Sequence, residues 1–65
     1  MSNIMTEVQK EVTRIRNTIA ETKMLFPKGN FNFSIIEGLL DEADEAIINQ
    51  NTIKLIKLLP ILQKT

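Results

Sequence analysis

The sequence predicts an all-α fold, made of one long N-terminal helix and a shorter antiparallel αα-hairpin. Apolar residues recur at spacings of three and four over residues 3–26, 35–48 and 52–63, which is the period of an amphipathic helix. Pro27 cannot continue the first helix, and Asn49-Gln50-Asn51 breaks the pattern between the second and the third. Because that connection is short, we expect the last two helices to run antiparallel.

Length and composition limit how this fold can be stabilised. Residues 1–65 form one small helical domain, and a chain of this length buries only about 60% of the surface that its unfolded form exposes. Disulfides, a structural metal or another subunit usually supply the missing stability. The chain has no Cys and no His, so we expect the three-helix protein to assemble as an oligomeric bundle.

The first helix carries a narrow apolar stripe that needs a packing partner. At 100° per residue the stripe covers an arc of roughly 100°. The hairpin helices are only about 15 and 12 residues long, so some 10 Å of the first helix is expected to project beyond them and expose Met5 and Val8. We therefore expect a homo-oligomer, most simply a dimer, although the pattern also permits packing within one chain, and trimers and tetramers stay open. The residues of this oligomer seam are Met5, Val8, Val12, Ile15 and Ile19.

Polar side chains mark the start of the first two helices. Ser2 and Asn3 are both good N-caps for the first helix. Ser34 and Glu37 have the spacing of a capping box, which predicts Ser34 as the N-cap of the second helix, with Asn32 as the rival cap.

Other residues predict local features of the turns and of the third helix. Asn51 is expected to cap the third helix, and Pro60 to bend it or to end its regular part near Leu59. Gly29 is free to adopt a positive φ in the turn after the first helix. Gly38 weakens the second helix and could mark the close approach of another helix backbone.

The charges cancel overall but are segregated along the chain. Residues 1–30 hold five basic and three acidic residues, residues 31–50 hold five acidic and no basic ones, and residues 51–65 hold three lysines and no acid. This distribution predicts that acidic and basic helices pack side by side, with complementary charges setting their orientation. A charged binding face is the alternative.

The residue types speak against catalysis. Without His, Cys, Tyr or Trp, the chain lacks the usual general bases, thiolate nucleophiles and zinc ligands. Asp41 and Glu45 are four residues apart and could bridge one divalent cation, but no EF-hand or di-iron motif surrounds them. Two glycines, far apart, are too few for a phosphate-binding loop. We therefore expect a non-enzymatic protein with no cofactor and no metal.

Two apolar features are candidate partner-binding sites. Phe31 and Phe33 lie in the loop after the first helix, where they either plug the end of the bundle or form an aromatic hot spot. Ile53 and Ile61 widen the apolar surface of the third helix beyond what one neighbouring helix covers. The function expected from this pattern is a protein-interaction or regulatory module that binds itself and an unidentified protein by docking a helix face.

The alternative is a small helical dimer that binds nucleic acid. Lys10, Arg14 and Arg16 could present a basic face of the first helix to phosphates. Zero net charge and the interleaved Glu7 and Glu11 speak against it.

No membrane association is expected. The chain has no apolar stretch of 18 residues and no basic N-terminal segment followed by an apolar run. The lysine-bearing third helix, with its internal Pro60, is a poor match to helices that lie in a membrane surface. The expected location is the cytoplasm.

Overall fold

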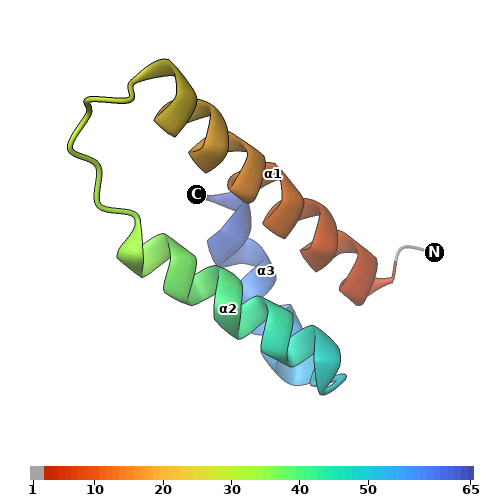
Figure 1. Cartoon of the computed structure of the whole chain (residues 1–65). Coiled ribbons are helices and arrows are strands. Elements are labelled where there is room, and N and C mark those ends of the chain that lie inside the picture. Colours follow the sequence, from red (N-terminus) through yellow and green to blue (C-terminus); the bar gives the residue numbers. More distant parts are fainter. Residues whose placement is uncertain (1–2) are drawn as a thin grey trace.

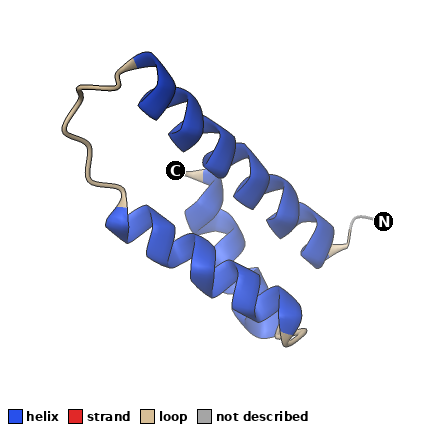
Figure 2. Cartoon of the chain, viewed as in Figure 1, coloured by secondary structure: helices blue, strands red, loops and turns tan. Residues whose placement is uncertain are grey.

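The computed structural model describes residues 3–65, and every regular element within them is an α-helix (Figures 1 and 2). The helices are α1 (Ile4–Leu25), α2 (Ser34–Ile48) and α3 (Thr52–Gln63). The prediction of an all-α, three-helix protein is confirmed.

The three helices share one core. An eight-residue loop, 26–33, joins α1 to α2, and α3 turns back after α2 so that the C-terminal end of the chain lies beside the middle of α1 (Figure 1). α1 packs more extensively against α3 than against α2. The buried side chains come from all three helices: Val8, Val12, Ile15, Ile19, Leu40, Ala43, Ala46, Leu55, Leu58 and Leu62.

The apolar stripe of α1 is therefore covered within a single chain. Val8 is fully buried and Met5 is half-buried against the core. The expectation that one chain leaves Met5 and Val8 exposed is wrong, because α3 ends level with Arg14 and therefore packs along the N-terminal half of α1. A dimer built on this seam would require the chain to open.

The end of α1 that α3 does not reach is the C-terminal one. Met24 and Leu25 are 77% and 71% exposed. The guanidinium of Arg14 donates a 2.9 Å hydrogen bond to the carbonyl of Leu62, which places the end of α3 level with the middle of α1. The last eleven residues of α1, roughly 16 Å of helix, extend past that point. α3 is too short to follow them.

Asparagine side chains begin all three helices, but the capping box of α2 does not form. Asn3 accepts a hydrogen bond from the amide of Met5, while Ser2 lies outside the described residues. At α2, the side-chain Oδ1 of Asn32 accepts hydrogen bonds from the backbone amide and the hydroxyl of Ser34 at 3.0 and 2.7 Å. Ser34 is itself the first residue of α2, so the prediction of Ser34 as N-cap is wrong. The N-cap residue is Phe33, which makes no side-chain cap bond, and Asn32 just before it supplies the side-chain acceptor. The carboxylate of Glu37 is drawn instead to an α1 lysine.

Neither glycine plays the role expected of it. Gly29 does not adopt a positive φ. A Cβ at this position would overlap the ring of Phe31, so the absence of a side chain is what lets that ring approach. Gly38 lies on the exposed side of α2, where an added Cβ would meet no atom within 4 Å, so no helix of the same chain approaches it closely.

The hairpin turn and α3 differ in part from the prediction. Asn51 caps α3 as predicted, accepting from the amide of Lys54 at 3.2 Å. Gln50, just before it, is held at a φ of 54°, a left-handed conformation that costs a non-glycine residue free energy. α3 continues through Pro60 to Gln63, the end predicted for this helix, so of the two alternatives for Pro60 the one that ends the regular part near Leu59 is wrong.

Candidate functional site

The outer face of α3 presents branched apolar side chains to solvent. Leu55, Leu58 and Leu62 are buried at spacings of three and four and define the inner side of the helix. Ile53, Ile56 and Ile61 lie away from that side and are 70%, 57% and 46% exposed. The sequence pattern singled out Ile53 and Ile61 but not Ile56.

This face is also basic. Lys57 and Lys64 are exposed and Lys54 is half-buried, and no acidic side chain occurs after Glu45. Within residues 3–65 none of the three lysines forms an ion pair. A face that combines exposed isoleucines with unpaired cations suits an occupant that is apolar and negatively charged.

The ion pairs between helices join α1 to α2. Arg16 of α1 pairs with Asp44, and Lys23 pairs with Glu37 at 3.6 Å. The prediction that acidic and basic helices pack side by side therefore applies to α1 and α2, while the lysines of α3 point elsewhere. Three acids of α2 form no ion pair in the described part of the chain: Asp41, Glu42 and Glu45.

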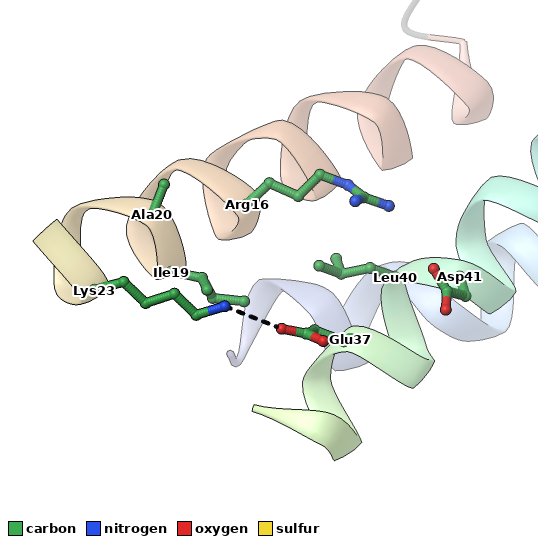
Figure 3. Close-up of a pocket in the computed structure, with 7 residues that line it drawn as sticks. All are labelled: Arg16, Ile19, Ala20, Lys23, Glu37, Leu40 and Asp41. Atoms are coloured by element: carbon green, nitrogen blue, oxygen red, sulfur yellow. Dashed lines mark ion pairs between the residues drawn. The ribbon is translucent and has the colours of Figure 1, made fainter. Parts of the chain in front are cut away.

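A trough of about 340 Å³ lies between the C-terminal half of α1 and the N-terminal half of α2 (Figure 3). Its floor is apolar, and its charged rims are joined by the Lys23–Glu37 ion pair, drawn as a dashed line. Both partners of that pair are more than half exposed, so the pair contributes little stability. The lining residues are Arg16, Ile19, Ala20, Lys23, Glu37, Leu40 and Asp41.

The three phenylalanines form one cluster in the loop. The rings of Phe31 and Phe33 stack with centroids 5.7 Å apart, and Phe26 meets Phe31 edge to face at 6.2 Å. Phe33 packs against the core and lies under the ammonium of Lys23, whereas Phe26 and Phe31 are exposed. The cluster thus anchors the loop through Phe33 and leaves two rings accessible.

The basic face proposed on α1 is largely engaged within the chain. Arg14 bonds Glu11 at 2.8 Å as well as the Leu62 carbonyl, and Arg16 pairs with Asp44. Arg14 thereby caps the C-terminal end of α3, a role that no local sequence signal indicates because the two residues are 48 positions apart. Lys10 is exposed.

Two further features bear on the kind of site. Over residues 3–65 no helix combines the length and apolarity needed to cross a membrane. Within the same range, no three acidic side chains gather as a metal site would require. No protein-family model matches this chain, and comparison with curated proteins and with solved structures finds no match.

Proposed function

We propose that this protein is a non-enzymatic interaction module that binds protein through the outer face of α3. The observation that carries the proposal is the exposure of Ile53, Ile56 and Ile61 among three lysines that form no ion pair within residues 3–65. A 65-residue domain has little apolar surface to spare, so leaving three isoleucines in water on one helix is best explained by a second molecule that covers them.

Two finer features belong to the same proposal. α2 and α3 form an antiparallel hairpin, which gives the outer face of α3 a rigid support. The chain also self-associates, because a small domain without disulfide or metal gains stability from a second copy. Phe31, at the opposite end of the molecule from the start of α3, is a secondary contact point.

The test compares three forms of the full chain as bait in cells that express it. Ile53→Lys places a charge on the proposed face at a side chain that makes little contact with the core. Thr13→Lys adds the same charge on the exposed side of α1 and serves as the matched control. Circular dichroism first establishes that both variants keep the helix content of the unmodified protein.

We expect the unmodified protein and Thr13→Lys to capture the same proteins, this chain itself included, and Ile53→Lys to lose at least tenfold of that signal. Equal capture by all three forms would remove the outer face of α3 as the binding surface. Loss of helix content in Ile53→Lys alone would show that Ile53 is part of the core and would contradict the proposal as well.

A further inference from the structure

The exposed side of α2 carries a regular stripe of its own. Ile35, Gly38, Glu42 and Glu45 follow one another at spacings of three, four and three, so they occupy an arc of about 80° on a helical wheel. All four are exposed. The acids that pair with α1 or line the trough, such as Asp44 and Asp41, lie to one side of this stripe.

The exposed side of α3 carries a matching stripe of opposite charge. Ile53, Lys57, Ile61 and Lys64 are spaced by four, four and three and also occupy about 80°. The α3 stripe alternates two isoleucines with two lysines, whereas the α2 stripe begins with Ile35 and Gly38 and ends with Glu42 and Glu45. The α2 stripe is acidic and the α3 stripe is basic.

Neither stripe can neutralise the other within one chain. α2 and α3 bury their apolar sides toward the shared core, so their exposed sides face outward, and no ion pair joins the two helices in the described residues. In a dimer with a two-fold axis, the acidic stripe of one copy can contact the basic stripe of the other. The axis places α2 of each copy over α3 of the other, so every charge match occurs twice.

We propose that the occupant of the outer face of α3 is the acidic stripe of α2 from a second copy of this chain. This inference rests on the proposed function and names its partner. Gly38 supports it, because the absence of a side chain there leaves a low point in the α2 stripe that admits an isoleucine of the facing α3. An interface of standard size covers about 800 Å² per partner, roughly a sixth of the 4935 Å² that one chain exposes.

The experiment is sedimentation equilibrium at tens of micromolar with charge-reversed variants of the full chain. Glu42 and Lys57 lie near the middle of their stripes, are exposed, and make no ion pair in the described chain. Glu42→Lys alone and Lys57→Glu alone each juxtapose like charges at both symmetry-related positions of a homodimer. We expect the unmodified protein to sediment at twice 7.4 kDa and each single variant at 7.4 kDa.

Mixing the two variants is the decisive measurement. In a heterodimer of Glu42→Lys with Lys57→Glu both charge pairs are attractive again, so the mixture is expected to return to the dimer mass. The double variant, carrying both changes in one chain, is expected to do the same. Glu21→Lys, an exposed reversal on α1 that touches neither stripe, is the control and is expected to remain dimeric.

Several results would overturn the inference. A mixture that stays monomeric, or single variants that stay dimeric, would place self-association elsewhere. If the unmodified protein is a 7.4 kDa monomer throughout but Ile53→Lys still loses captured proteins, the proposed function stands and its partner is a different protein. If the protein is monomeric and Ile53→Lys captures the same proteins as the unmodified chain, both the proposed function and this inference are wrong.

Discussion

At one end of the molecule Val8 of α1 and Leu55 of α3 are fully buried, whereas at the other end Met24 and Leu25 of the same α1 lie mostly in water. The difference follows from the number of helices present. Three helices meet at the first end, which we name the closed end, and only α1, α2 and the phenylalanine loop meet at the second, the open end (Figure 1). The stability of the protein should therefore be concentrated at the closed end, and the open end should tolerate change.

A matched pair of leucine truncations gives the largest expected contrast. Leu55→Ala at the closed end removes a fully buried side chain and should lower the free energy of unfolding by about 2–5 kcal/mol. Leu25→Ala at the open end should change it by less than about 0.5 kcal/mol. Urea denaturation followed by circular dichroism measures both, and equal losses would show that the two ends are packed alike.

A glycine in the hairpin turn should strengthen the closed end. Gln50 has a φ of 54°, where a side chain is unfavourable, so Gln50→Gly should raise the free energy of unfolding by about 1 kcal/mol. Asn49→Gly is the control, because Asn49 has a φ of −85°, which is not strained. Glycine there only increases the conformational entropy of the unfolded chain and should lower the free energy of unfolding. If Asn49→Gly raised the free energy of unfolding as much as Gln50→Gly, the inference that the backbone of Gln50 is strained would be wrong.

At the open end, the cap of α2 should depend on Asn32 more than on Ser34. Asn32→Ala removes the acceptor of two hydrogen bonds and should cost about 1 kcal/mol. Ser34→Ala should cost only a few tenths of a kcal/mol. The Ser34 hydroxyl is exposed, and Asn32 Oδ1 still accepts a hydrogen bond from the backbone amide of residue 34 when the hydroxyl is removed. Thermal melts of the two variants decide the order, and the reverse order would reinstate the capping box with Glu37.

The smallest effect is expected for the ion pairs between α1 and α2. A double-mutant cycle of Arg16→Ala and Asp44→Ala should yield a coupling of about 0.2–1 kcal/mol in dilute buffer, because both side chains are nearly half exposed. The coupling should fall toward zero in about 1 M NaCl, where charges are screened over about 3 Å. A coupling that survives this salt concentration would mean that the pair is shielded and that the open end is more closed than its exposure indicates.

Local signals predicted the helices, and long-range packing decided the rest. Each signal that predicted a helix or its end is local: apolar periodicity extends over a few turns, and Pro27 and Asn51 act on their immediate neighbours. The three helices could therefore be predicted from the sequence. Which end of α1 stays exposed depends on where α3 packs along it. The residue pattern of α1 alone contains no information about that position. The residues of α1 that form ion pairs with α2 could not be predicted either, because they too depend on how the helices pack.

The candidate site was predictable in part. Ile53 and Ile61 stood out because they fall away from the leucines of the third helix. Ile56 was missed, although Leu55, Leu58 and Leu62 alone define a buried side that excludes it. The role of Arg14 could not be predicted, because its acceptor is a backbone carbonyl whose availability arises only when α3 ends beside it.

The hydrogen bond between Arg14 and Leu62 joins the first helix to the last, and this has a consequence for the order of synthesis. α1 leaves the ribosome before α2 and α3, yet the helix that covers most of its apolar stripe is the last of the three to be synthesised. Until Thr52–Gln63 has been made, the stripe of α1 has only the limited contact with α2 to bury it. The three helices can therefore bury this stripe only after α3 has been made, and a nascent chain arrested within the hairpin turn exposes an apolar surface that favours aggregation.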